Sequence, residues 1–287
     1  MSFQKVGACN AFEYQFNNLS TTLPVRPFTN TSFTNILFKL MAASNIFVKN
    51  HNNIDWRAAT TETYTSLNPI TVWRIPVFSF IPNLNELKLM LSFQEIEKIN
   101  RYQHKNDRNQ RIISKAVLRI LLGRYTGINP KEIRFQADQN KKLAVNNPFL
   151  KLNFNVSHSG DWVLIIIADV SVGIDVEQMD ASFTWQNMLP LVFSRQEIDF
   201  IYHSTLPRQS FYELWTRKES LLKATGKGLT DDIALIPALN GIHPNPETIS
   251  GSAENWQINS FYVDENHMAS ITFNPVKTAL QFFNFQL

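Results

Sequence analysis

The stretch LNFNVSHSGDWVLIIIADVSVGIDVE, Leu152 to Glu177, carries the clearest structural pattern in the chain. It predicts three strands, LNFNVS, WVLIIIAD and VGIDVE, because each is a short run rich in β-branched and apolar residues. Ser-Gly-Asp marks the turn between the first two strands, and Val-Ser marks the turn before the third. A mostly antiparallel sheet is therefore expected here.

Helices are predicted on both sides of this stretch, so the expected fold class is α+β. The segment 107–127 has an apolar face and, at steps of three, four and four residues, a basic stripe. The apolar face consists of Ile113, Val117, Ile120 and Leu121, and the stripe of Arg108, Arg111, Lys115 and Arg119. A second helix is expected over FYELWTRKESLLKAT, 211–225, and a closing hairpin around Asp264–Asn266.

Helix and strand groups occur twice, which divides the chain into a half over 67–171 and a half over 172–287. Residues 1–66 are rich in Asn, Thr and Phe and show no clean period. We interpret them as an N-terminal extension of unknown role that is dispensable for the chemistry, with one helix over 34–50.

Charge is concentrated in one part of the chain. The net charge is only +3, yet 88–142 holds thirteen Lys or Arg and five Asp or Glu. Such a segment indicates an anionic partner: a nucleic acid, a phosphate-bearing cofactor or an acidic protein.

Cys9 is the only cysteine, which excludes an internal disulfide and a cysteine-based metal site. No secretory pattern opens the sequence, and VLIIIA, 163–168, is too short to span a membrane, so a cytoplasmic protein is expected.

The pentapeptide GIDVE places two carboxylates side by side. Alternate residues of a strand point the same way, so Asp175 and Glu177 share one face. Two such groups repel unless a cation lies between them. Mg²⁺, with its coordination completed by water and a phosphate, is a common cation in this position. The alternative is an exposed strand edge with solvated acids.

The second helix carries further charged residues. Glu219 and Lys223 are four residues apart and share a face. They form either a plain ion pair, worth about 0.2–0.5 kcal/mol, or part of a site. In a site, Glu219 is a third metal ligand, and Lys218 and Lys223 bind phosphate. In NVSHSGDW, Ser157 and His158 are either phosphate ligands or structural residues.

Three motifs in this order, FNVSHSGDW, GIDVE and WTRKESLLKATGKGL, resemble the 4′-phosphopantetheinyl transferases of the surfactin-synthetase-activating (Sfp) type. The resemblance covers roughly Ile70 to the C-terminus. It implies a pseudo-dimer of two similar halves, each a helix packed on a small sheet, with coenzyme A in the cleft between them.

The resemblance also implies roles for individual residues. Mg²⁺ is expected on Asp175, Glu177 and Glu219, and the phosphates on Lys218 and Lys223. Ser157 and His158 match residues that hold the 3′-phosphoadenosine end. Lys142, in KKL, replaces the lysine of a GKP-like element, and Lys98 and Arg111 lie where further basic phosphate ligands are expected.

The implied reaction moves 4′-phosphopantetheine from coenzyme A to a serine of an apo acyl or peptidyl carrier protein. Adenosine 3′,5′-bisphosphate is the other product, and fatty acid, polyketide and nonribosomal peptide carriers are the expected acceptors. The general base is Glu219, Glu197 or a metal-bound water. A monomer is expected. The alternative function is a non-catalytic protein that binds RNA or DNA through the basic stripe.

Overall fold

The computed structural model describes residues 44–67, 69–137, 142–147, 151–228, 232–276 and 279–287. Most strands of these residues lie in two five-stranded sheets. The first sheet has the order β2 (Trp56–Ala58), β12 (Leu280–Asn284), β3 (Ile70–Pro76), β7 (Trp162–Ala168), β6 (Asn153–Ser159). The second sheet has the order β8 (Val172–Gln178), β11 (His267–Phe273), β10 (Trp256–Asp264), β1 (Asn45–Asn50), β9 (Gly241–Pro244). A separate pair joins β4 (Phe135–Ala137) to β5 (Leu143–Val145).

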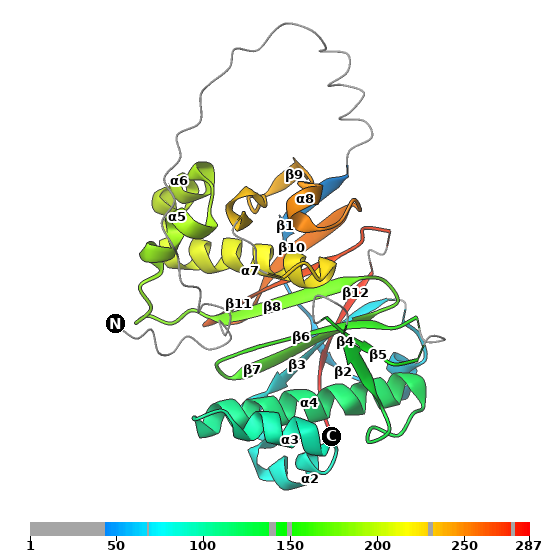
Figure 1. The fold of residues 1–287 in the computed structure, drawn as a ribbon. Helices are drawn as coiled ribbons and strands as arrows, with labels where there is room; N and C mark the ends of the chain where they lie inside the picture. The colour runs from blue at the N-terminus through cyan, green and yellow to red at the C-terminus, as the bar shows by residue number, and fades with distance from the viewer. Residues whose placement is uncertain (1–43, 68, 138–141, 148–150, 229–231, 277–278) are drawn as a thin grey trace, which may run out of the picture.

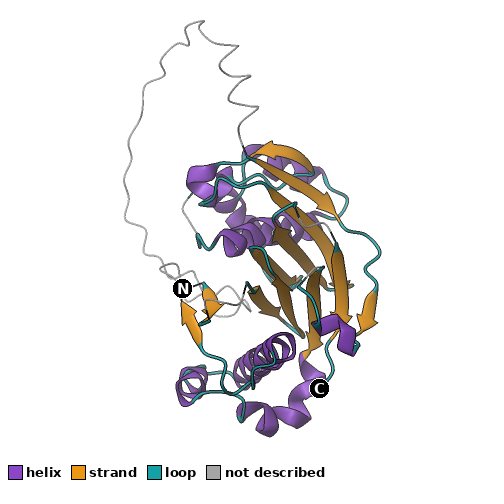
Figure 2. Cartoon of the chain, turned by 90° about the vertical axis from the view of Figure 1, so that its right-hand side faces the viewer, coloured by secondary structure: helices purple, strands orange, loops and turns teal. Residues whose placement is uncertain are grey.

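The helices lie on both sides of the strands, as Figure 2 shows. They are α2 (Leu84–Lys88), α3 (Phe93–Asn100), α4 (Lys105–Thr126), α5 (Leu189–Val192), α6 (Arg195–His203), α7 (Pro207–Thr225) and α8 (Glu247–Ser250). Short 3₁₀ segments are η1 (Thr61–Tyr64), η2 (Val77–Asn83), η3 (Trp185–Met188) and η4 (Ile233–Leu235). In Figure 1, α7 lies across β8 and β11, and α4 lies below the first sheet.

The two sheets repeat one pattern of strand directions, which confirms the expected doubling. From β6, the first sheet pairs antiparallel, antiparallel and then parallel, ending at β12. From β8, the second sheet does the same, ending at β1. Apolar residues of both sheets form one buried cluster. Its members include Ile70, Val72, Leu164 and Ile166 of the first sheet and Ile174, Val176, Ala269 and Ile271 of the second. The halves are therefore joined by a shared core.

Each sheet takes its fourth strand from the opposite end of the chain. β12, near the C-terminus, pairs with β3, and β1 lies between β10 and β9. The expected boundary between residues 171 and 172 separates β7 from β8, but β12 and β1 each join the sheet of the opposite half, and β1 and β2 lie before residue 67. The expected helix over 34–50 is wrong for Asn45–Asn50, where Ile46 and Val48 alternate as buried strand residues; residues 34–43 lie outside the described residues.

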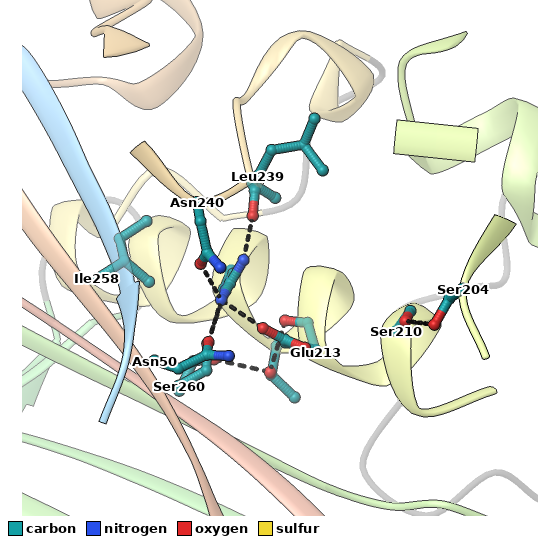
Figure 3. Close-up of polar contacts among 12 residues, drawn as sticks. Asn50, Ser204, Ser210, Glu213, Leu239, Asn240, Ile258 and Ser260 are labelled. Carbon is teal, nitrogen blue, oxygen red and sulfur yellow. Dashed lines mark hydrogen bonds and ion pairs between the residues drawn. The ribbon is translucent and has the colours of Figure 1, made fainter. Parts of the chain in front are cut away.

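A buried arginine ties β1 to α7. Arg217 donates to Asn50 Oδ1 at 2.5 Å and to Ser260 Oγ at 2.7 Å, and it forms an ion pair with Glu213. Figure 3 shows Asn50, Glu213, Asn240 and Ser260 gathered around this point. Residues Asn45–Asn50 are thus built into the fold, although they belong to the segment interpreted as an N-terminal extension.

The α4 helix packs its apolar face on the first sheet as predicted. Ile113, Val117 and Leu121 are fully buried. Of the basic stripe, Arg119 is buried and pairs with Glu95 at 2.9 Å, whereas Arg108, Arg111 and Lys115 are partly exposed. Arg108 donates to the Tyr102 carbonyl and Lys115 pairs with Glu95, so these stripe residues also have partners within the protein.

Candidate active site

The two carboxylates of β8 are buried against a row of serines on β6. Asp175 is 2% exposed and Glu177 is 4% exposed, so the solvated strand edge is excluded. Ser157 Oγ donates to Asp175 Oδ1, and Ser159 Oγ donates to Glu177 Oε2, each at 3.0 Å. The sequence reasoning missed Ser159, although its period-two spacing from Ser157 could have revealed it.

The α7 helix brings Glu219 and Lys223 next to the two carboxylates of β8. Lys223 Nζ lies 2.6 Å from Asp175 Oδ1 and 3.0 Å from Ser157 Oγ. The close approach of α7 to β8 depends on Gly173: a Cβ there would lie 2.1 Å from the Ser220 carbonyl oxygen. We call Asp175, Glu177, Glu219 and Lys223 the carboxylate site.

Burial and mutual repulsion perturb these acids. Burial, and then the Asp175 charge, raise the pKa of Glu219 to about 7. The same two causes raise the pKa of Glu177 well above its usual value, and burial raises the pKa of Asp175. Burial alone would lower the pKa of Lys223, but the surrounding carboxylates outweigh it and the net change is upward. Three acids thus share a single ammonium group.

No group of three or more His, Cys, Asp or Glu side chains in the described residues is already gathered tightly enough to hold a metal ion. The donor set nevertheless fits a hard cation. Asp175 Oδ2 and Glu219 Oε1 are buried and accept no hydrogen bond. Carboxylate oxygens are the ligands that Mg²⁺ prefers, and a divalent charge would balance the excess of acids.

Further nitrogen-bearing side chains adjoin the carboxylate site. His158 lies on β6 with its Nδ1 buried and unpaired. Burial, and then the charges of Arg111 and Lys223, lower the pKa of His158 to about 4. The guanidinium of Arg111 also stacks on the Tyr102 ring at 3.9 Å. Lys142 donates to the Ala224 carbonyl, one residue beyond Lys223. Arg111 and Lys223 thus lie near His158, while Lys142 contacts the C-terminal end of α7.

Three other predicted residues are not part of this group. Lys98 is exposed on α3, and no contact of the described residues joins it to the carboxylate site. Lys218 is fully buried on another side of α7, where it pairs with Glu197 at 2.9 Å and donates to the Ile233 carbonyl. The expectation that Lys218 points into the cleft is wrong, because one helical step turns its side chain about 100° from Glu219.

Glu197 is equally unsuited to act as a general base. It is 2% exposed, caps α6 through the Ser194 backbone amide, and accepts from the Ala238 amide at 2.9 Å. These contacts, together with the ion pair to Lys218, hold the carboxylate in place. Its role is structural in this fold.

Comparisons with known proteins agree with this geometry. Residues 171–272 match the family model described as 4′-phosphopantetheinyl transferase superfamily, and residues 80–170 match 4′-phosphopantetheinyl transferase, N-terminal. HetI of Nostoc sp., a 4′-phosphopantetheinyl transferase, is 27% identical over 70% of this chain and 86% of its own length. Sfp of Bacillus subtilis is 29% identical over 49% of this chain and 62% of its own length. The L-aminoadipate-semialdehyde dehydrogenase-phosphopantetheinyl transferase of Mus musculus is 31% identical over 55% of this chain and 56% of its own length.

These matches define a phosphopantetheinyl transferase. The chain belongs to the 4′-phosphopantetheinyl transferase superfamily, in its two-domain, Sfp-type form, and its reaction is phosphopantetheinyl transfer from coenzyme A to carrier proteins. No helix within the described residues has the length and apolar character needed to cross a bilayer.

Proposed function

We propose that the carboxylate site is where the transfer occurs, that it depends on Mg²⁺, and that adenosine 3′,5′-bisphosphate is the second product. The observation that carries this proposal is the gathering of three acids, the buried Asp175 and Glu177 and the partly exposed Glu219, around the ammonium group of Lys223. Buried charge without compensation is costly, so such an arrangement suits a ligand that brings positive charge.

Asp175, Glu177 and Glu219 would hold the cation. When bound, Mg²⁺ would neutralise the pyrophosphate of coenzyme A and stabilise the charge that develops on the leaving phosphate. The serines of β6 orient two of these acids, since Ser157 and Ser159 each donate to one carboxylate. Such outer partners fix the direction of a ligating carboxylate.

The positive groups beside this site are proposed to bind the phosphates of coenzyme A. Lys223 already contacts Ser157 and Asp175, and Arg111 lies close enough to His158 to affect its titration. A phosphate between them would satisfy His158 Nδ1 and Arg111 Nε, which are buried and unpaired. His158 and Lys142 are assigned to the 3′-phosphate.

Glu219 is proposed to accept the proton of the carrier serine. The serine oxygen forms a bond to the β-phosphorus, and the bond from that phosphorus to the bridging oxygen breaks. The bridging oxygen leaves with adenosine 3′,5′-bisphosphate. Glu219 Oε1 accepts no hydrogen bond, which leaves this oxygen open to the serine proton. Every residue in this scheme comes from one chain, so a monomer suffices.

The alternative of nucleic-acid binding is disfavoured by the same observations. The stripe residues Arg108 and Arg119 are engaged with internal partners, and the site beside Arg111 carries three acids.

The test is to incubate the protein with coenzyme A, Mg²⁺ and an apo-carrier protein, and then to weigh the carrier. We expect a mass increase of one phosphopantetheinyl group, which Asp175→Asn and Glu219→Gln reduce by a hundredfold or more. Asp199→Asn, an equal charge change at an exposed position on α6, is the matched control. An unmodified carrier with the unaltered protein, or full activity in Asp175→Asn, would overturn the proposal.

A further inference from the structure

Tyr212 lies on the same face of α7 as the carboxylate site. It precedes Glu219 by seven residues, which is about 20° short of two full turns of an α-helix. Lys223 follows Glu219 by four residues, which is about 40° more than one full turn. Tyr212, Glu219 and Lys223 therefore form one line along the helix, and Lys218 lies off it.

The hydroxyl of Tyr212 is buried without a hydrogen-bond partner. The side chain is only 2% exposed, and its oxygen makes no hydrogen bond in the structure. A buried tyrosine hydroxyl normally finds a hydrogen-bond partner, and leaving it unpaired is unfavourable. Tyr125 shows the usual case, because its hydroxyl pairs with Thr71 Oγ1 at 2.8 Å. The unpaired hydroxyl of Tyr212 requires an explanation.

The register of α7 on the second sheet places this hydroxyl at the Glu177 end of the site. Ser220 pairs with Thr272, which lies opposite Gly173, and Thr216 pairs with Ser270, which lies opposite Asp175. One helical turn further towards the N-terminus, Tyr212 therefore lies beside Glu177.

Burial, and then the charge of Glu177, raise the pKa of Tyr212, so the hydroxyl remains a donor. Arg208 and Asp180 also face it: the Arg208 guanidinium donates to the Asp180 and Phe183 carbonyls, and the Asp180 amide approaches the tyrosine oxygen. Ser159 donates to Oε2 of Glu177, and no hydrogen bond to its Oε1 is seen among the described residues.

We propose that Tyr212 is a positioning residue, whose hydroxyl donates a hydrogen bond to Glu177 and holds that carboxylate in place as a ligand when a divalent cation is bound. This inference rests on the proposed function, because it requires the cation. A ligating carboxylate commonly keeps an outer hydrogen-bond donor, and loss of such a donor typically weakens metal binding by about 10–100-fold. Tyr212 acts through Glu177 and needs no contact with substrate.

The test uses Tyr212→Phe in the full chain, with Mn²⁺ as the probe. We expect Mn²⁺, measured by calorimetry on the protein without coenzyme A, to bind about 10–100-fold more weakly. The kcat should fall while the KM for coenzyme A stays near its original value. In EDTA, the variant should be at least as stable as the unaltered protein, because an unpaired hydroxyl has been removed.

The matched control is Tyr125→Phe, which removes a paired hydroxyl far from the acids in sequence. It should lower the stability in EDTA and leave Mn²⁺ binding unchanged. Unaltered Mn²⁺ affinity in Tyr212→Phe would overturn the inference, and so would a loss of stability in EDTA matching that of Tyr125→Phe. Asp175→Asn separates the two proposals: if it keeps Mn²⁺ binding and activity, the proposed site itself fails. If it loses both while Tyr212→Phe is normal, only the role of Tyr212 fails.

Discussion

A residue on an α-helix points about 100° away from the residue before it. Lys218 and Glu219 of α7 therefore face different surroundings although they are adjacent in the chain. Lys218 is enclosed with Glu197, whereas Glu219 and Lys223 face β8. The two lysines of this helix differ in role accordingly: one stabilises the fold, and the other belongs to the site.

Substitution of the two lysines by methionine should separate stability from activity. Lys218→Met leaves the Glu197 carboxylate buried without its partner, which costs about 3–5 kcal/mol. The thermal midpoint should fall by roughly 6–20 °C. Lys223→Met removes a charged phosphate ligand and should raise the KM for coenzyme A by tenfold or more. Calorimetry and carrier-mass kinetics on both variants provide the comparison. A stable Lys218→Met protein with a raised KM would reverse the assignment.

Ionisation of Glu219 should make the protein less stable as the pH rises. Its pKa is raised from 4.5 to about 7, so the native state holds a proton that the unfolded chain has released. The resulting stability is fully present below about pH 4.5 and is lost as the pH rises through about 7. His158, with its pKa lowered to about 4, acts in the opposite sense between about pH 4 and 6.5.

The difference between Glu219→Gln and the unaltered protein isolates the contribution of Glu219. In EDTA, the variant's advantage in unfolding free energy should grow between pH 5 and pH 8, by at most about 1.4 kcal/mol per pH unit. Adding Mg²⁺ at pH 8 should stabilise the unaltered protein more than the variant. A pH-independent difference would show that Glu219 is not a buried acid with a raised pKa.

At the scale of elements, strands and helices with a regular period were predictable from the sequence. The alternating and β-branched residues of 152–177 predicted β6, β7 and β8 within a few residues of their observed ends. The helical spacing of 107–127 likewise predicted α4, which ends at Gly127 with a φ of 71°. Period-two spacing also placed Asp175 and Glu177 on one face.

The sequence did not predict β1, and the reason is physical. β1 is a parallel neighbour of β10, about 200 residues away, and no local turn marks such a pairing. Its six residues end with the exposed Lys49 and Asn50, so only Ile46 and Val48 carry the strand pattern. The position of Lys218 was not predictable from the composition of its motif, because adjacent residues of a helix point about 100° apart.

Removal of β1 should unfold the protein. Burial of Ile46 and Val48 alone contributes about 3–6 kcal/mol, a large part of a typical total of 5–15 kcal/mol. A chain that begins at Asn52 also loses the bond between Asn50 and Arg217. We expect it to lack a cooperative thermal transition, whereas a chain that begins at Ser44 keeps one. Cooperative unfolding and activity in the shorter chain would restore the view that residues before 67 are an extension.

At the scale of the whole molecule, the site lies where the two halves meet. β6 of the first sheet supplies Ser157, Ser159 and His158, and β8 of the second supplies the two strand acids. The Asn155 side chain accepts from the Ile174 amide at 3.0 Å, which adds a direct bond between these strands. The site therefore exists only when both sheets are complete and in contact.

Because the two ends of the chain are exchanged between the sheets, the halves should not fold separately. Fragment 1–170 contains β1 but lacks β12, and fragment 171–287 contains β12 but lacks β1. Each fragment would leave a gap in its own sheet and expose half of the apolar cluster that the sheets share. We expect neither fragment alone to show a cooperative thermal transition by circular dichroism. Mixed in equal amounts, they should regain that transition together with transferase activity, since each supplies the strand that the other lacks. A fragment that unfolds cooperatively by itself would show that the exchanged strands are not required for either half.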